Sequence, residues 1–172
     1  FGRPVVPGGQ GAGGATQASS SACGPFACTP GVRLLSWTPL DAFAGATAAN
    51  DCWGYVSPTG REYALIGLSN GTAVVEVTVP SAPVVVAHVR GPSSTWRDVK
   101  TYGQWAYAVS EGGGGIQAFD LTDVDLGIVK PAGSYSRFRS HNAYVDEATG
   151  SRYRPSGGRN RLHVYHLNSK HV

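Results

Sequence analysis

The feature that most constrains the fold of this chain is a segment, residues 50–121, that reads as two copies of one unit. Each copy has an apolar run, a glycine-containing turn and a second run with an acidic residue near its end. The runs are REYALIG (61–67) and TAVVEV (72–77), then QWAYAVS (104–110) and IQAFDL (116–121). Tyr63 and Tyr107 are 44 positions apart. Asn-Gly and Gly-Gly turns between β-rich runs predict hairpins, and a period of about 40–45 residues predicts the blades of a β-propeller.

A third, weaker copy follows the first two. Tyr153 lies 46 positions after Tyr107, and RLHVYHL (161–167) ends 46 positions after Leu121. Its middle, RYRPSGG (152–158), is poor in apolar residues and contains a proline, which removes a donor from a strand ladder. We therefore predict an all-β protein, a propeller-like array of about three blade repeats that forms a partial propeller. The expected repeat boundaries within residues 50–172 are 50–94, 95–138 and 139–172.

Composition agrees with this fold class. The chain has 172 residues, of which 24 are glycine and 11 proline, and hydrophobic residues make up 41%. That is enough for one domain with a core and many turns. No apolar run approaches the roughly 18 residues that span a bilayer, so membrane association is expected only through an anchor or a partner complex. The net charge of +3 and the absence of a nucleic-acid-binding motif argue against nucleic-acid binding.

Two segments precede the repeats. Residues 1–22 are rich in Gly and Ser and are predicted to be a flexible arm, because they cannot bury enough apolar surface to offset their ordering entropy. Residues 23–49 form a lead-in, with a strand expected over 32–40 and a helical turn capped by Asp41. Cys23 and Cys28 flank a Gly-Pro turn and favour a structural disulfide of an exported protein over a metal site. The third cysteine, Cys52, is expected to be a buried free thiol, although exchange with this pair stays open.

The candidate site is built from polar residues that recur at equivalent places in the copies. The motifs WRD (96–98) and SHN (140–142) are 44 positions apart, and Asn50 and Asp51 lie near the equivalent place in the first copy. If these positions begin the inner strands, their side chains meet at one mouth of a channel. The residues are Asp51, Arg97, Asp98, His141 and Asn142.

Two interpretations of this set stay open. The oxygens could bind a cation such as Ca²⁺, or Arg97 and His141 could bind a small anion. The simpler interpretation is that Asp and Asn side chains hydrogen-bond backbone groups and hold the blades together. No cofactor is predicted, and Ca²⁺ is the ion that the residue types would suit. DLTDVD (120–125) lacks the glycine and terminal glutamate of an EF-hand, so we interpret it as a turn at the end of a blade.

Taken in order, the motifs resemble the choice-of-anchor B family, which is built on LVIVD-type repeats. They are NDCWGY (50–55), GREYALIGLSNGT (60–72), VTVPSAPV (77–84), STWRDVK (94–100), AYAVSE (106–111), IQAFDLT (116–122) and SHN (140–142). The cysteine pair and residues 32–40 fit that family's lead-in, so the match covers roughly residues 23–150. The resemblance implies an extracytoplasmic, propeller-like bacterial or archaeal protein, often tethered to the cell surface by interchangeable C-terminal anchors. It implies no reaction.

The chain departs from that family's pattern in two ways. Cys52 stands where an aliphatic residue is expected. The repeats also stop after the third, whereas a closed propeller has about 4–8 blades. We therefore expect a truncated propeller whose open repeat edge is covered by further chain, by further copies or by a protein partner.

These observations lead to two hypotheses about function. The first is a non-enzymatic extracytoplasmic binding or scaffolding module, and one form of this hypothesis makes the chain a subunit of a larger surface or membrane-associated assembly. The alternative is a metal-dependent hydrolase or lactonase-like propeller that uses the Asp and His residues at the channel mouth. The fold by itself cannot choose between them.

Overall fold

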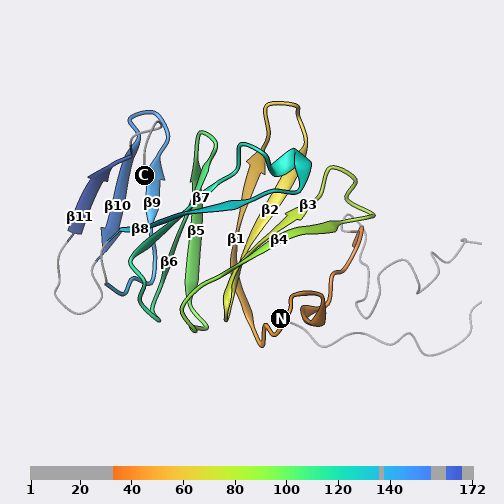
Figure 1. Cartoon of the computed structure of the whole chain (residues 1–172), viewed down its shortest axis with the longest axis horizontal. Coiled ribbons are helices and arrows are strands. Elements are labelled where there is room, and N and C mark those ends of the chain that lie inside the picture. The colour runs from red at the N-terminus through yellow and green to blue at the C-terminus, as the bar shows by residue number, and fades with distance from the viewer. Residues whose placement is uncertain (1–32, 136–137, 156–161, 168–172) are drawn as a thin grey trace, which may run out of the picture.

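The computed structural model describes residues 33–135, 138–155 and 162–167, which form three antiparallel sheets (Figure 1). The first sheet has strands β1 (Ala49–Val56), β2 (Glu62–Leu68), β3 (Gly71–Glu76) and β4 (Val84–Arg90). The second has β5 (Arg97–Tyr102), β6 (Trp105–Ser110), β7 (Ile116–Asp120) and β8 (Lys130–Tyr135). The third has β9 (Tyr144–Asp146), β10 (Ser151–Pro155) and β11 (Leu162–His166). The prediction of an all-β protein is confirmed.

Each sheet is a meander, in which every strand pairs with its neighbours in the chain. The turn at residues 69–70 joins β2 to β3 and the glycine-rich segment 111–115 joins β6 to β7, as the hairpin signals predicted. The strands are rich in Val, Tyr and Ala, and successive side chains of a strand alternate between the two faces of a sheet. Both faces of the second sheet are therefore able to carry apolar side chains.

The sheets lie side by side in chain order, with the second sheet between the other two (Figure 1). Strand β1 contacts β5, and β5 contacts β9, so the first strands of the three sheets are neighbours. We call the contact between the first and second sheets the first junction, and the contact between the second and third sheets the second junction.

Each junction is filled by apolar side chains from the two sheets that meet there. The cluster at the first junction includes Tyr63, Leu65 and Val74 from one sheet and Val99 and Phe119 from the other, all buried. The cluster at the second junction is smaller. It contains Tyr107, Val109, Ile116, Ala118, Ala143, Val145 and Leu167. Burying a side chain of Leu or Phe size contributes roughly 1.5–3 kcal/mol, so these clusters are the main source of cohesion between the sheets.

The lead-in differs from its prediction. Residues 33–39 are not in a strand, and a short 3-10 helix, η2 (Leu40–Ala42), has Pro39 rather than Asp41 at its N-cap. The segment lies over the outer face of the first sheet, where Phe43 packs against Leu68 and Val75. A second 3-10 helix, η3 (Val124–Leu126), connects β7 to β8. In the described parts of the chain, no helix is long and apolar enough to cross a membrane.

Candidate functional site

Asp51 belongs to a bulge that interrupts the pairing of β1 with β2 between Asn50 and Cys52. Its φ of 52° is in the left-handed region, which Asp tolerates better than most residues. The bulge turns the carboxylate towards the second sheet, where Oδ2 accepts a hydrogen bond from the backbone N–H of Val99 at 2.9 Å. Asp51 therefore bridges the first junction from its edge, with 29% of its side chain exposed.

Asp98 makes the corresponding bond across the second junction. Its Oδ2 accepts from the backbone N–H of Ala143, and its Oδ1 accepts from the ammonium of Lys100. Only 6% of the residue is exposed. Burial, and after it the hydrogen bond with Asp51, raises the pKa of the Asp98 carboxyl above its ordinary value, against the opposite effects of Lys100 and the Ala143 N–H.

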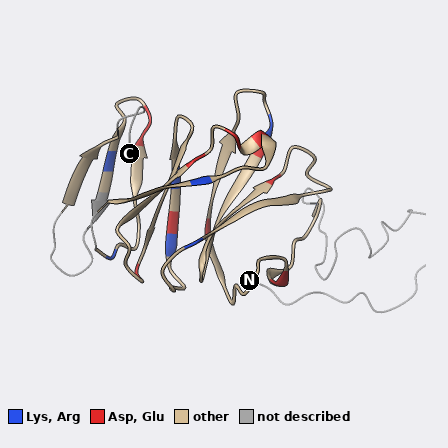
Figure 2. Cartoon of the chain, in the orientation of Figure 1, with Lys and Arg blue, Asp and Glu red and all other residues tan. Residues whose placement is uncertain are grey.

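Lys100 completes this cluster and was missed in the sequence. Its Nζ lies 2.9 Å from the carbonyl oxygen of Val99 and 3.6 Å from Oδ2 of Asp51. The ammonium also lies 4.4 Å from the centre of the Trp53 ring, while the indole N–H of Trp53 donates to Thr101. The signal was available, because residues two apart on a strand share a face and Lys100 follows Asp98 at that spacing. Figure 2 shows that β5 carries both acidic and basic positions.

Arg97 lies inside the molecule and is only 1% exposed. Its guanidinium donates to the carbonyl oxygens of Leu68 (3.1 Å) and Pro92 (2.6 Å) and to the amide oxygen of Gln117 (2.8 Å). Burial lowers the pKa of this guanidinium. The bond to Leu68 ties the start of β5 to the first sheet. Together the three bonds engage the guanidinium within the protein, so it is not presented to an anion.

His141 and Asn142 are exposed, in contrast to Arg97 and Asp98. The Nδ1 of His141 lies 2.8 Å from Oε1 of Glu111, and its ring lies 5.2 Å from the ring of Trp96. A depression of about 230 Å³ is lined by Glu111, Arg139, Ser140 and His141. The structure thus brings together Asp51 and Asp98 and pairs His141 with Glu111, a residue that the sequence did not single out.

Asp125 is a further residue with several hydrogen bonds, and the sequence predicted only that it lies in a turn. Its carboxylate accepts hydrogen bonds from Tyr63 (2.6 Å), Thr59 (2.7 Å) and Ser57 (3.1 Å). The Tyr63 bond, more than the others, lowers the pKa of Asp125, and burial together with that bond raises the pKa of Tyr63. Since Asp125 is on η3, this network fastens the second sheet to the first.

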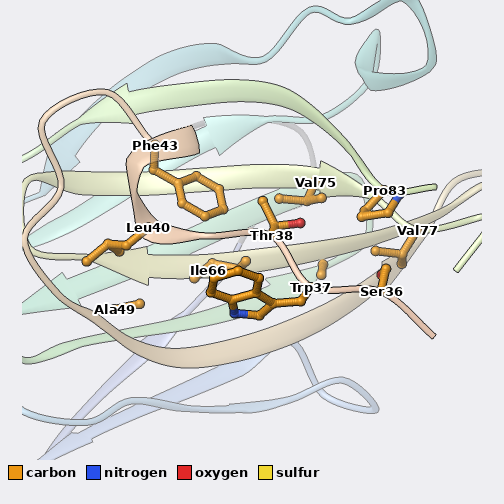
Figure 3. A pocket seen from close by; sticks show the side chains of 11 residues that line it. Ser36, Trp37, Thr38, Leu40, Phe43, Ala49, Ile66, Val75, Val77 and Pro83 are labelled. Carbon is orange, nitrogen blue, oxygen red and sulfur yellow. The ribbon is translucent and has the colours of Figure 1, made fainter. Parts of the chain in front are cut away.

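An apolar hollow lies on the outer face of the first sheet. It has a volume of about 560 Å³ and lies under the lead-in, between η2 and strands β1 to β3 (Figure 3). Its lining is mostly apolar, and Trp37 lies over Ile66 there (Figure 3). Trp37 itself is 54% exposed. Ala64 and Ile66 on this face are only half-buried and Cys52 is exposed, so the lead-in covers the face only in part.

The cysteine predictions have different outcomes. Cys52 has a free thiol, but it is exposed and not buried as predicted. The reason is that its side chain lies on the face of β1 that is turned away from the second sheet, opposite Ile66, which lines the hollow under the lead-in. Cys23 and Cys28 lie outside the described residues, and so does the predicted flexible arm, residues 1–22.

The predicted site residues therefore have mainly bonding roles between sheets. Two carboxylates accept backbone N–H groups of the next sheet, and one guanidinium is held by carbonyl and amide oxygens. Among the described residues, no group of three or more His, Cys, Asp or Glu side chains is arranged to hold a metal ion. No protein-family model matches the chain, and neither a curated protein nor a solved structure shows significant similarity to it.

Proposed function

We propose that this chain is a non-enzymatic extracytoplasmic binding or scaffolding module, built as part of a β-propeller, whose contact surface is the outer face of the third sheet. The propeller is supported by three features. The sheets are meanders, their first strands are neighbours, and apolar faces meet between successive sheets. The extracytoplasmic location and the kinship with the choice-of-anchor B family rest on the motifs described above.

The observation that carries this proposal is the hydrogen bonding of the Asp51 and Asp98 carboxylates. Each carboxylate is occupied by a backbone N–H of the next sheet, and Asp98 is also paired with a lysine. Oxygens bonded in this way are poor candidates for a metal ligand or a general base. The competing hypothesis, a metal-dependent hydrolase, depends on these same oxygens and therefore has less support.

The outer face of the third sheet offers a surface that suits a protein partner. Tyr144, Leu162 and Val164 lie on this face and are 62%, 65% and 58% exposed. Register confirms that they share it, because Tyr153 pairs with both Tyr144 and Val164, and Leu162 is two residues from Val164. Contiguous exposed apolar residues mark interaction sites more often than isolated ones.

The kind of partner follows from what the other apolar faces contact. In both junctions such a face is covered by a neighbouring antiparallel sheet. We therefore expect the third sheet to dock a protein that presents an antiparallel sheet, either another protein or a further copy of this chain.

A photo-crosslinking experiment tests this function. A benzophenone amino acid is placed at Val164, and in a matched control at Leu126, which is 76% exposed but lies on η3. The protein is irradiated in cells of its source organism. We expect a protein adduct from position 164 and none from position 126. Absence of an adduct at 164, or equal adducts at both positions, would overturn the proposal.

A further inference from the structure

The hydrogen bonds that join successive sheets follow one pattern. This pattern indicates which partner fits the outer face of the third sheet. Asp98 projects towards the third sheet and accepts the N–H of Ala143, which is the residue after Asn142. Asp51 projects towards the second sheet and accepts the N–H of Val99, which is the residue after Asp98. In both junctions an acidic side chain on one first strand thus accepts an N–H at or just before the first strand of the next sheet.

Asn142 is the next member of this series. It lies 44 positions after Asp98 and two positions before Tyr144, and it is exposed. An asparagine amide supplies the same acceptor oxygen as an aspartate. Within the part of the chain that is described, this side chain makes no hydrogen bond, so the acceptor at the end of the series is available.

The donor that would complete the series is on the same chain, at the opposite end of the molecule. Val99 stands opposite Ala108 in the second sheet, and Gly54 stands opposite Ala64 in the first. Since Ala64 and Ala108 are 44 positions apart, Gly54 is the counterpart of Val99. It is exposed on β1, which is the edge strand of its sheet.

The surroundings of Gly54 are open and partly apolar. A side chain at this position would meet no heavy atom within 4 Å. Cys52, two residues earlier on the same face of β1, is exposed as well. The exposed indole of Trp37 adds apolar surface on this side of the first sheet (Figure 3). The lead-in thus leaves room beside β1 for another sheet.

We propose that two copies of this chain associate head to tail, with the outer face of the third sheet of one copy against the outer face of the first sheet of the other. In this contact Asn142 accepts the backbone N–H of Gly54 of the second copy, and Tyr144 and Val164 pack near Trp37. The inference rests on the proposed function and names its partner. A head-to-tail contact closes into a ring when the rotation between the copies allows it, and a two-fold rotation would satisfy both contacts in a closed dimer.

The first experiment measures association of the 172-residue chain by analytical ultracentrifugation over a range of concentrations. Tyr144→Glu is expected to weaken the dimer about tenfold or more, since it puts a charge into the apolar contact. Asn142→Ala removes one hydrogen bond and is expected to weaken it about 2- to 12-fold. Leu126→Glu, on an exposed residue outside both faces, is the matched control and leaves association unchanged.

Gly54→Glu tests the part of the contact that the first sheet contributes. Its side chain has space in a single copy, so folding is preserved, but it blocks the second copy and abolishes the dimer. The contact joins two different faces, and each variant changes only one of them. In a mixture, the unmodified third sheet of the Gly54→Glu protein can still bind the unmodified first sheet of the Tyr144→Glu protein. A heterodimer is therefore expected. Association that survives Gly54→Glu, or a mixture that stays monomeric, would overturn the head-to-tail arrangement.

The photo-adduct from position 164 separates this inference from the function on which it rests. A crosslink to residues 34–61 of the same chain, the peptide that contains Cys52 and Gly54, supports both. A crosslink to a different protein keeps the binding function and refutes self-association. No crosslink refutes both. Alkylation of Cys52, followed by mass spectrometry of that peptide, should slow as the protein concentration passes the dissociation constant, and an unchanged rate would contradict burial by a second copy.

Discussion

Tyr63 and Tyr107 are 44 positions apart, and each is about 1% exposed on the second strand of its sheet. The Tyr63 hydroxyl donates to Asp125 at the first junction, whereas the Tyr107 hydroxyl finds no partner among the described residues. Arg152 lies instead over the Tyr107 ring, 5.4 Å from its centre. The same residue at the same place in two sheets is thus polar and bonded in one and effectively apolar in the other.

For the two carboxylates that cross the junctions the order is reversed, because the buried, charged contact is at the second junction. Asp51 crosses the first junction at an exposed edge, while Asp98 crosses the second in the interior together with Lys100. The first junction depends on a large apolar cluster and on polar bonds near its rim. The second has a smaller cluster and a buried ion pair. The comparison teaches that neighbouring sheets of similar architecture can be joined by different balances of apolar contact and charge.

The largest effect is expected from Asp98→Ala. Removing this carboxylate leaves the Lys100 ammonium and the Ala143 N–H without their partner in a buried place, which costs about 3–5 kcal/mol of unfolding free energy. Asp51→Ala removes a partly exposed hydrogen bond and should cost about 0.5–1.5 kcal/mol. Urea unfolding followed by tryptophan fluorescence measures both. Equal losses for the two variants would show that burial does not distinguish the junctions.

The apolar clusters are compared by truncating Leu65 and Val109, which are 44 positions apart and fully buried. Leu65→Ala at the first junction should destabilise the protein by about 2–5 kcal/mol, since it leaves a cavity. Val109→Ala removes two carbons and should cost about 1.6 kcal/mol, plus a cavity contribution. The same unfolding assay applies, and a larger loss for Val109→Ala would reverse our ranking of the two clusters.

A smaller, pH-dependent effect is expected at Asp125. Because its pKa is lower in the folded protein than the ordinary value of 3.8, the unfolded state binds more protons as the pH falls below that value. The stability that Asp125 contributes is therefore present above pH 3.8 and is lost as the pH falls through the folded pKa. Tyr63→Phe removes the main cause of this shift and should flatten the acid limb of a stability–pH curve. An unchanged limb would mean that other carboxylates govern acid unfolding.

The smallest effect is expected from Tyr107→Phe. The Tyr107 hydroxyl is buried without a bond among the described residues, so its removal relieves a desolvation penalty while the ring contacts stay. The change in unfolding free energy should lie between zero and a gain of about 1 kcal/mol. A clear loss of stability would show that the hydroxyl has a partner, and would make the two tyrosines equivalent.

The sequence by itself determined the β-rich class and the hairpins. Those follow from local chemistry, because alternation of apolar residues and glycine-containing turns depends on near neighbours in the chain. The spacing of 44 residues also pointed to Asp98 and Asn142 as corresponding positions, and to bonding between blades as one possible role of the carboxylates.

Only the tertiary structure decided what each polar side chain contacts. The burial of Arg97, the bond from the Ala143 N–H to Asp98 and the bond from Tyr63 to Asp125 depend on residues of different strands or sheets. The exposure of Cys52 depends on a face of β1 that the lead-in leaves bare. Such contacts arise when sheets pack against one another, and the pattern of neighbouring residues in the sequence does not determine which faces will meet.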